Sequence, residues 1–309
     1  MEILKSDNSF LITALKNIVS EELNVTVNTI NFIAGGSNGK VFKAETSDGS
    51  VLALKAYREQ GNQLREAAQL RILSANTAVP MPEVVFTHAD TETAVLAMSF
   101  IDGHNVLNPA FLLKSKAQKQ KFAADVINGM SMWHELSSKK FGALDNPQYG
   151  TWLEYYIKEK QEPWLKALEA LNKKGKFSSK RLDLLYRASE LFERVYTEPK
   201  KAVLIHGDLN IMNIMADIKT LELNGFIDPM GSMWADREYD LFQLMNMWGN
   251  SFYLYETYKS KHSLPKESDF RVAYYGAMNE ASCRLGSGIH IPVWEELCIM
   301  RLEKQMKIF

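Results

Sequence analysis

The sequence predicts a mixed α/β (α+β) fold of two lobes, in which a small antiparallel-sheet lobe precedes a larger, mostly helical lobe. Five short β-like runs and two helical segments occur in the first third of the chain, whereas helical periodicity dominates after about residue 112. With 309 residues, 46% of them hydrophobic, the chain can bury a sizeable core. We predict lobes at residues 1–98 and 99–309, joined near SFIDGHN.

The period of the apolar residues predicts each element of the first lobe. Residues 8–23 have the spacing of an amphipathic helix, and the strand-like runs VNTINFIA, KVFKAETS and SVLALKAY follow. Asp48 and Gly49 lie between the last two runs, where a tight hairpin turn is expected. Residues 63–75 return to helical spacing, and two further strands, EVVFTH and TAVLAMSF, come after the breakers in VPMPE. The resulting sheet should be antiparallel.

The second lobe is predicted to be built mainly from long helices. Helical periods run through residues 114–136, 152–172 and 178–196. The segment VLIHGDLNIMNIMADIKTLELNGFIDPMGS interrupts them, and its apolar runs VLI, IMNIM and NGFI are predicted to be short core strands. These strands would hold the polar residues of the segment at one edge.

Composition excludes several classes of partner. Lys plus Arg total 36 and Asp plus Glu 37, so no excess charge indicates a nucleic acid or an anionic membrane surface. The opening MEILKSDNSF lacks a basic segment followed by an apolar one, and the run AVLAMSFI is far too short to span a membrane. Two cysteines, Cys283 and Cys298, are too few for a disulfide framework and are expected to be buried thiols. We therefore expect a cytoplasmic protein; its oligomeric state stays open.

The first chemical motif is the glycine-rich turn in AGGSNGKVF. A Walker A loop would need glycine at Ala34 and a serine or threonine after the lysine, and a dinucleotide-binding motif would need a helix where this sequence continues as a strand. The kinase spacing G-x-G-x-x-G-x-V fits, with Ala34 in place of the first glycine. Gly35, Gly36 and Gly39 are therefore candidates for binding phosphate through backbone N–H groups. A plain hairpin turn would explain the same glycines.

Lys55 and Glu66 form the second candidate constellation. Lys55 ends an apolar, strand-like run, and Glu66 lies 11 residues later in the predicted helix, from which it could reach back to the sheet. Such a pair can fix an ammonium group against two phosphates. The alternatives are an edge-strand lysine that reaches solvent and a glutamate on a solvated helix face.

The strongest signal is His206-Gly207-Asp208, with Asn213 five positions after Asp208 and Asp228 twenty positions after it. From average residue usage, the pattern His-x-Asp-x-x-x-x-Asn should arise by accident in on the order of one in a hundred chains of this length. Asp208 can accept the proton of an attacking hydroxyl, while Asn213 and Asp228 offer the hard oxygen ligands that Mg²⁺ prefers. His206 is expected to orient the loop. Ordinary turn chemistry of Asp and Asn is the alternative.

Together these segments resemble the aminoglycoside phosphotransferase and choline kinase superfamily, whose bilobal fold is similar to that of protein kinases. The resemblance rests on AGGSNGKV, Lys55, Glu66, HGDLNIMN and IDPMGSMWADREYDL, and it covers nearly the whole chain. Within the superfamily, the fructosamine (ketosamine) kinases are the nearest likeness, through FGALDNPQYGTWLEYYIKEKQEPWLKAL and the segment after Asp228. One departure is that Asn210 follows HGDL where fructosamine kinases usually carry tryptophan.

The resemblance implies ATP and Mg²⁺ as cofactors and assigns a role to each motif residue. Asp208 would be the catalytic base, and Asn213 and Asp228 would hold magnesium, with Asn213 also belonging to the catalytic loop. Lys55 with Glu66 would organise the α and β phosphates, and Asp240 would anchor the catalytic loop. Backbone groups of three further residues would hydrogen-bond adenine: Ser99, Phe100 and Ile101.

The function expected from the sequence is ATP-dependent transfer of the γ-phosphoryl group to a hydroxyl of a small molecule, most plausibly an amine-bearing sugar such as a ketosamine. An aminoglycoside or a choline-like alcohol is an alternative acceptor, and a nucleotide-binding regulator without turnover is the alternative of another class. A cationic amine would require carboxylates in the cleft. Five could supply them, and the sequence does not choose among Asp102, Asp145, Asp236, Glu238 and Glu280.

Overall fold

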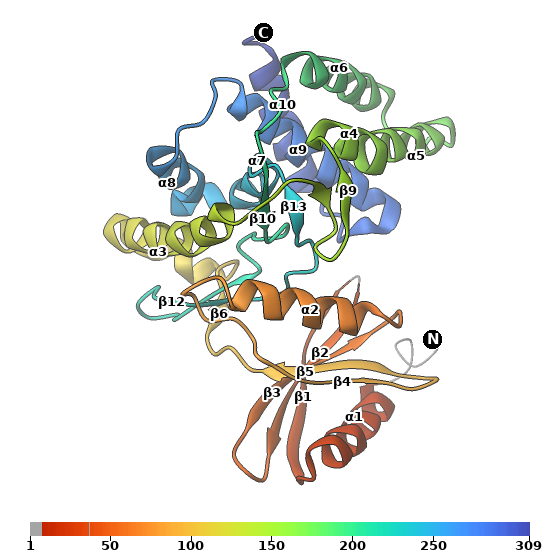
Figure 1. The fold of residues 1–309 in the computed structure, drawn as a ribbon, viewed down its shortest axis with the longest axis vertical. Helices are drawn as coiled ribbons and strands as arrows, with labels where there is room; N and C mark the ends of the chain where they lie inside the picture. The colour runs from red at the N-terminus through yellow and green to blue at the C-terminus, as the bar shows by residue number, and fades with distance from the viewer. Residues whose placement is uncertain (1–7, 37) are drawn as a thin grey trace.

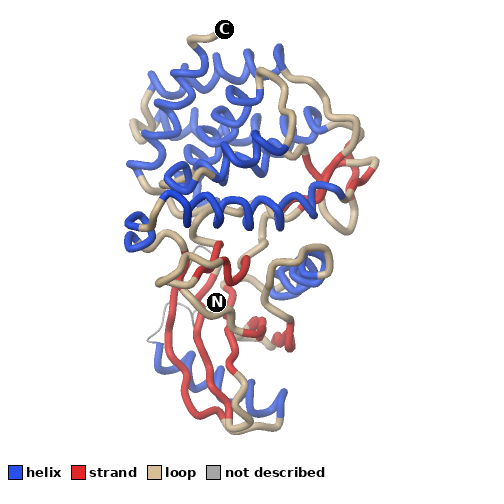
Figure 2. The backbone as a smooth tube through the Cα atoms, turned by 90° about the vertical axis from the view of Figure 1, so that its left-hand side faces the viewer, coloured by secondary structure: helices blue, strands red, loops and turns tan. Residues whose placement is uncertain are grey.

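The computed structural model describes residues 8–36 and 38–309. Residues 1–7, which belong to the opening segment MEILKSDNSF, and Ser37 of the glycine-rich turn lie outside the described residues. A five-stranded sheet occupies one end of the molecule, and the C-terminal residue lies at the opposite end among helices (Figure 1). The side view in Figure 2 shows the long strands gathered in the lower part and most of the helices above them. The mixed α/β architecture with an antiparallel sheet is confirmed.

The first part of the chain has the elements that the sequence predicts. They are α1 (Asn8–Leu23), β1 (Val27–Gly35), β2 (Gly39–Thr46), β3 (Val51–Tyr57), α2 (Asn62–Ser74), β4 (Val84–Ala89) and β5 (Ala94–Ser99). The strands are ordered β1-β2-β3-β5-β4, and each neighbouring pair is antiparallel. The turn between β2 and β3 forms where expected, because Gly49 has a φ of 86° and its N–H donates to Thr46 O at 3.1 Å.

Alternation along β3 decides which way Lys55 faces. Side chains of successive strand residues point to opposite faces of a sheet. Leu52, Leu54 and Ala56 belong to the core cluster that includes the buried side chains of α1. Ala53 and Tyr57 belong to the other cluster, which includes the buried side chains of α2 and continues into the helical lobe. Lys55 shares the face of Ala53 and Tyr57 and therefore points toward α2, which lies between the sheet and the rest of the molecule (Figure 1).

The remainder of the chain is mostly helical, with short strands between the helices. Its helices are α3 (Lys116–Glu135), α4 (Trp152–Tyr156), α5 (Glu162–Lys173), α6 (Ser179–Val195), α7 (Glu238–Leu241), α8 (Leu254–Lys261), α9 (Ser268–Ser282) and α10 (Pro292–Met306). Its strands are β6 (His104–Asn105), β7 (Ser137–Ser138), β8 (Phe141–Gly142), β9 (Pro147–Tyr149), β10 (Ala202–Ile205), β11 (Ile214–Ala216), β12 (Leu223–Phe226) and β13 (Met233–Ala235). Shorter helical turns are η2 (Pro109–Leu113), η3 (Ile157–Gln161), η4 (Gln243–Met245), η5 (Gly249–Phe252) and η6 (Cys283–Ser287).

Three details differ from the sequence-based expectation. The helix predicted over residues 152–172 contains a π-type turn at Ile157–Gln161, so its hydrogen-bond ladder changes register there. Only the last two residues of IMNIM enter a strand, because the preceding residues form a turn. Cys298 is buried as expected, but Cys283 is partly exposed. In the described part of the chain, no helix is long and apolar enough to cross a membrane.

Candidate active site

Asp208 lies on a loop, residues 206–213, that follows the buried strand β10; we call it the His206 loop. Gly207 has a φ of 77°, and a Cβ atom there would lie 2.0 Å from the carbonyl oxygen of Gly231. Only glycine allows this close approach. The His206 loop therefore packs backbone against backbone on the segment 228–232, which we call the Asp228 loop.

Asp240 holds the start of the His206 loop, as the sequence predicts. Its Oδ2 accepts a hydrogen bond from the backbone N–H of His206 at 3.2 Å, and its Oδ1 accepts one from Gly207 at 2.8 Å. His206 is fully buried, its Nδ1 accepts from the Asp208 N–H at 3.3 Å, and its ring lies against Trp133. These contacts fit the expected role of His206 in orienting the loop.

Two asparagine side chains fix the carboxylate of Asp208. Asn210 Nδ2 donates to Asp208 Oδ1 at 2.8 Å, and Asn213 Nδ2 donates to Asp208 Oδ2 at 3.0 Å and to the Asp208 carbonyl oxygen at 2.7 Å. Burial, followed by the charge of Asp228, raises the pKa of Asp208 to about 8, although both asparagine bonds oppose the rise. Sequence reasoning did not predict the contact of Asn210.

Strand pairing brings Asn213 next to the Asp228 loop. β11 and β12 are antiparallel with Ile214 opposite Phe226, and the Ile227 N–H donates to the Asn213 carbonyl oxygen at 3.0 Å. Asn213 precedes β11 and Asp228 follows β12, so both lie at the same edge. Asp228 adopts a φ of 59°, a left-handed conformation that costs on the order of 1–3 kcal/mol and clusters at functional sites.

Lys55 joins the sheet, α2 and the Asp228 loop. Its Nζ lies 2.7 Å from Glu66 Oε2 and 2.8 Å from Asp228 Oδ1, and the Tyr57 hydroxyl donates to the same Glu66 oxygen at 2.6 Å. The side chains of Lys55 and Glu66 are 7% and 1% exposed. Burial alone would lower the pKa of Lys55, but the charges of Asp228 and Glu66 outweigh it and raise that pKa, so Lys55 is a cation. Tyr57 was not predicted from the sequence.

The three glycines lie where β1 turns back into β2: Gly35 ends β1, Gly36 follows it, and Gly39 begins β2. The Gly36 N–H donates to the Gly39 carbonyl oxygen at 2.9 Å, and Arg58 Nη2 donates to the Gly36 carbonyl oxygen at 3.2 Å. A Cβ atom at Gly39 would lie 2.0 Å from the carbonyl oxygen of Ala56, whereas one at Gly36 would meet nothing within 4 Å and one at Gly35 would make only ordinary contact with Phe32. Of these three positions, only that of Gly39 requires glycine for packing.

The segment expected to hydrogen-bond adenine leaves β5 and leads into the helical lobe. Two of its three backbone N–H groups are used within the fold: Ser99 donates to Glu83 O at 2.8 Å, and Phe100 donates to Val51 O at 3.1 Å. Ile101 is partly buried, and its N–H makes no hydrogen bond to any described residue. Of these N–H groups, only that of Ile101 remains available to a ligand.

The oxygen atoms of Asn213 and Asp228 suit a magnesium ion that is shared with phosphates. Asn213 turns its Nδ2 toward Asp208, which leaves its Oδ1 as a free acceptor, and Asp228 uses only Oδ1 on Lys55. Among residues 8–36 and 38–309, no three His, Cys, Asp or Glu side chains converge to form a metal cage by themselves. Mg²⁺ commonly takes one or two protein oxygens together with waters and substrate phosphates, and this donor set fits that pattern.

Two of the carboxylates considered for amine binding are used inside the fold. Asp236 accepts from the Tyr196 hydroxyl at 2.8 Å. Glu238 forms a buried pair with Arg271, with oxygen–nitrogen distances of 2.6 and 2.7 Å. The first contact holds Asp236 against the end of α6, and the second joins α7 to α9, so both carboxylates are removed as candidates.

Glu280 stands apart from the other candidates because it is buried without a cation. It is 7% exposed, and among the described residues its Oε1 accepts only from the amides of Asn246 at 3.3 Å and Asn279 at 3.5 Å. Burial raises its pKa to about 7. The charges of Glu280 and Asp208 both act on the thiol of Cys283, whose pKa is raised to about 12, chiefly by burial. Two other candidates, Asp102 and Asp145, are exposed.

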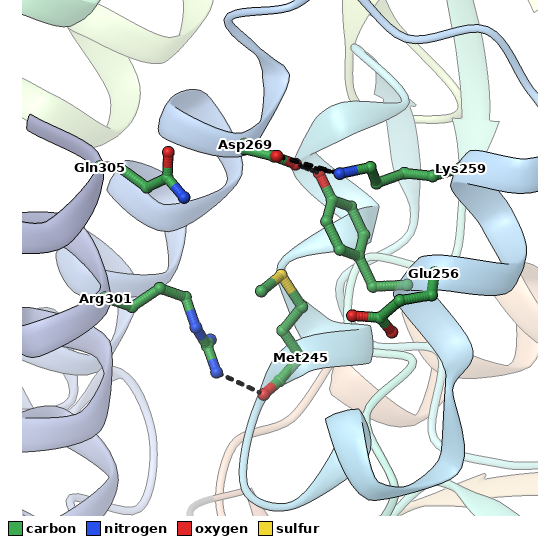
Figure 3. A pocket seen from close by; sticks show the side chains of 7 residues that line it. Met245, Glu256, Lys259, Asp269, Arg301 and Gln305 are labelled. Atoms are coloured by element: carbon green, nitrogen blue, oxygen red, sulfur yellow. Dashed lines mark hydrogen bonds and ion pairs between the residues drawn. The ribbon is translucent and has the colours of Figure 1, made fainter. Parts of the chain in front are cut away.

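A separate pocket of about 180 Å³ lies between η4, α8, α9 and α10 (Figure 3). Across it, Lys259 Nζ pairs with Asp269 at 2.8 Å, and Arg301 Nη2 donates to the Met245 carbonyl oxygen at 3.3 Å. None of the site residues predicted from the sequence lines this pocket. It is distinct from the constellation around Lys55 and Asp208.

Comparison with solved structures shows a shared fold. A candidate fructosamine-3-kinase from Thermobifida fusca superposes with a TM-score of 0.69 at 18% identity, over 96% of this chain and 99% of that one. A second candidate fructosamine-3-kinase, from Haemophilus somnus, gives 0.68 at 15% identity over 94% and 96% of the two chains. The GDP and kanamycin complex of the aminoglycoside phosphotransferase APH(2'')-IIIa gives 0.64 at 14% identity over 96% and 99%. At identities this low, the superpositions establish similarity of fold alone.

Comparison of sequences establishes the family. The uncharacterized protein YcbJ of Escherichia coli K12 is 26% identical over 201 residues, which are 63% of this chain and 66% of YcbJ. The chain thus spans slightly less than two thirds of the length of this relative. Residues 29–255, which include all of the predicted site residues, match the phosphotransferase enzyme family, APH. The chain belongs to the phosphotransferase enzyme family.

Proposed function

We propose that the protein is an ATP-dependent small-molecule kinase, which transfers the γ-phosphoryl group to a hydroxyl of an amine-bearing sugar such as a ketosamine. One observation carries the proposal: Lys55 reaches Glu66 on α2 at 2.7 Å and Asp228 in the helical lobe at 2.8 Å. A buried cation placed between these two carboxylates supports a nucleotide phosphate site at the junction of the sheet and the helical lobe.

The nucleotide would be held from both sides of this junction. The glycine turn at Gly35, Gly36 and Gly39 and the ammonium of Lys55 would bind phosphate oxygens, and the free N–H of Ile101 would face adenine. Asn213 Oδ1 and the Asp228 carboxylate would hold Mg²⁺, which neutralises charge on the phosphates when bound.

In this mechanism Asp208 prepares the nucleophile. The acceptor oxygen forms a bond to the γ-phosphorus while the bond from that phosphorus to the bridging oxygen breaks, and ADP leaves. Asp208 takes the proton of the acceptor hydroxyl, and Asn210 and Asn213 keep its carboxylate pointed at one place. A pKa of about 8 suits this task, because a general base works best when its pKa lies near the working pH.

Glu280 supports an amine-bearing acceptor. A buried carboxylate that has only amide partners lacks the counter-charge that such groups usually have. An ammonium group of the acceptor would supply that charge. Solved neighbours of this fold include candidate fructosamine kinases and an aminoglycoside phosphotransferase in complex with kanamycin, which makes sugar-amines the first class to test.

Aminoglycosides and choline-like alcohols are alternative acceptors for the same chemistry, and a nucleotide-binding regulator is the alternative without turnover. An ADP-release assay with fructosyl-lysine, ribosyl-lysine, choline and kanamycin separates them. The proposal expects the highest kcat/KM with a ketosamine. A preference for kanamycin or choline would reassign the acceptor, and tight ATP binding without ADP release for any compound would favour the regulator.

A further inference from the structure

A second contact between α2 and the Asp228 loop depends on Gln69. The side-chain Nε2 of Gln69 donates to the carbonyl oxygens of Ser232 at 3.3 Å and Met230 at 3.4 Å. Gln69 is only 6% exposed. A side chain of the sheet-bearing part of the molecule is thus buried against the backbone of the loop that begins with Asp228.

Gln69 and Glu66 act from the same face of α2. They are three residues apart, which places them on adjacent turns of one helix face. Glu66 fixes the ammonium of Lys55, and Gln69 fixes the backbone near Asp228. The helix therefore contacts both Lys55 and the loop that carries its partner Asp228.

The Asp228 loop is in turn tied to the His206 loop. Ser232 Oγ lies 2.7 Å from the Pro229 carbonyl oxygen and 3.1 Å from the His206 carbonyl oxygen. A displacement of α2 would be passed through Gln69 to the Asp228 loop. The backbone contact between Gly207 and Gly231 would then pass it to the loop that carries Asp208.

The amide of Gln69 is not explained by packing stability. Its Nε2 faces two carbonyl oxygens, so the opposite amide orientation would place oxygen against oxygen. With Nε2 facing the carbonyl oxygens, Oε1 of Gln69 is buried and has no hydrogen-bond partner among the described residues. An unpaired buried oxygen lowers the free energy of unfolding. A methionine would fill the same space without that cost. What the amide adds is the pair of bonds to the Asp228 loop.

We propose that Gln69 is a positioning residue for phosphoryl transfer: it holds the Asp228 loop against α2 so that Asp228 keeps a fixed place relative to Lys55. This inference rests on the proposed function, because it assigns Asp228 to the metal and Lys55 to the phosphates. It predicts that loss of the Gln69 amide weakens the use of Mg²⁺ without removing any group that touches the nucleotide.

The test is the Mg²⁺ dependence of ADP binding, measured by calorimetry on the purified full chain, because it needs no knowledge of the acceptor. Gln69→Met should raise the Mg²⁺ concentration for half-maximal ADP affinity by about tenfold, as is typical when a group that supports a metal ligand is removed. Without Mg²⁺, ADP should bind the parent and the variant equally. A loss of helix position alone would weaken ADP binding under both conditions.

Gln63→Met is the matched control. Gln63 lies on the same helix and is 2% exposed, but its Oε1 accepts only from the Gly61 N–H at 2.8 Å, next to the helix start. Its Mg²⁺ dependence should equal that of the parent. Thermal unfolding of both variants reports on folding, and Gln69→Glu, which places a carboxylate against the two carbonyl oxygens, should give a larger Mg²⁺ effect than Gln69→Met.

Equal Mg²⁺ titrations for the parent, Gln69→Met and Gln63→Met would overturn the positioning role while leaving the kinase proposal intact. If the acceptor screen failed while Mg²⁺-dependent ADP binding was normal and weakened in Gln69→Met, the kinase proposal would be wrong and the positioning of the Asp228 loop by Gln69 would stand. If the parent bound no ADP at all, both proposals would be wrong.

Discussion

Lys55 Nζ lies 2.8 Å from Asp228 Oδ1, although the two residues are 173 positions apart in the chain. This contact and the 2.7 Å contact with Glu66 place one cation between two carboxylates. Because the pair of Lys55 and Glu66 is almost fully buried while the Asp228 side chain is 39% exposed, the two contacts should respond differently to substitution. Glu66 depends on Lys55 for its counter-charge, whereas Asp228 can turn to water or to a metal ion.

Lys55→Met should therefore destabilise the fold as well as weaken nucleotide binding. Removing one partner of a buried pair leaves an uncompensated charge and typically costs about 3–5 kcal/mol of unfolding free energy. The double variant Lys55→Met/Glu66→Gln should recover part of this loss, because no buried carboxylate remains. Urea unfolding measures both values. Lys121→Met is the control. Lys121 pairs with Asp125 on the surface, where an ion pair contributes little, so no measurable change in unfolding free energy is expected. An equally small effect of Lys55→Met would contradict the account.

Asp208→Ala should reduce kcat by roughly 10²–10⁴-fold, the usual contribution of a general base. ADP affinity measured without Mg²⁺ should stay close to that of the parent, since Asp208 contacts Asn210 and Asn213 and no proposed phosphate ligand. Rapid-quench kinetics and equilibrium ADP binding separate the two quantities. A variant that keeps most of the parent rate would show that another group takes the proton.

The pH dependence of turnover should report the raised pKa of Asp208. The carboxylate is the active form, so kcat/KM should rise as the pH approaches and passes about 8. Bound Mg²⁺ would oppose the effect of the Asp228 charge and move this limb to lower pH. Asn210→Ala removes a hydrogen bond that lowers this pKa, and it should therefore move the limb to higher pH. A pH profile that is identical for Asn210→Ala and the parent would contradict the assignment.

The raised pKa of Asp208 also predicts the direction in which the stability of the fold changes with pH. In the folded state the pKa of Asp208 is about 8, so its carboxyl keeps a proton up to about that pH, whereas in the unfolded chain this carboxyl has its ordinary pKa of 3.8. The stabilising contribution is therefore complete below pH 4 and is lost as the pH rises to about 8. Asp208→Asn should gain Tm relative to the parent as the pH is raised from 5 to 8. A Tm difference that stays constant over this range would contradict the raised pKa of Asp208.

Glu280→Gln should impair amine-bearing acceptors selectively. It keeps the size and the amide contacts of the side chain but removes the charge that would pair with an ammonium group. The KM for a ketosamine should rise by about tenfold, since one charged hydrogen bond is worth roughly 1.5–3 kcal/mol, while the KM for its N-acetylated form should not change. Asp145→Asn serves as the control with an exposed carboxylate. Equal losses for both forms of the acceptor would indicate a purely structural role.

Much of the fold follows from local sequence signals. The alternation of β3, the hairpin turn at Asp48-Gly49 and the helical spacing of α2 each depend on residues close together in the chain, and the structure has these elements within one or two residues of their predicted bounds. The pairing of Lys55 with Glu66 was also predictable, because their separation of 11 residues is set by one turn between a strand and a helix.

Contacts that depend on distant segments could not be predicted in the same way. Gln69 and Ser232 are 163 residues apart, and no sequence motif pairs the two positions. Glu280 has the same residue type as many surface glutamates, and only the packing of α9 buries it without a cation. The turn in IMNIM was missed because an apolar run of five residues is consistent with either a strand or a buried loop.

The most direct test of the central claim is the anomalous scattering of Mn²⁺ in crystals grown with ADP, since Mn²⁺ takes the oxygen ligands that Mg²⁺ prefers. The account predicts a manganese ion bound by Asn213 Oδ1 and the Asp228 carboxylate, with a nucleotide phosphate beside Lys55. A manganese ion or a nucleotide bound elsewhere, with Lys55 still between Glu66 and Asp228, would contradict it.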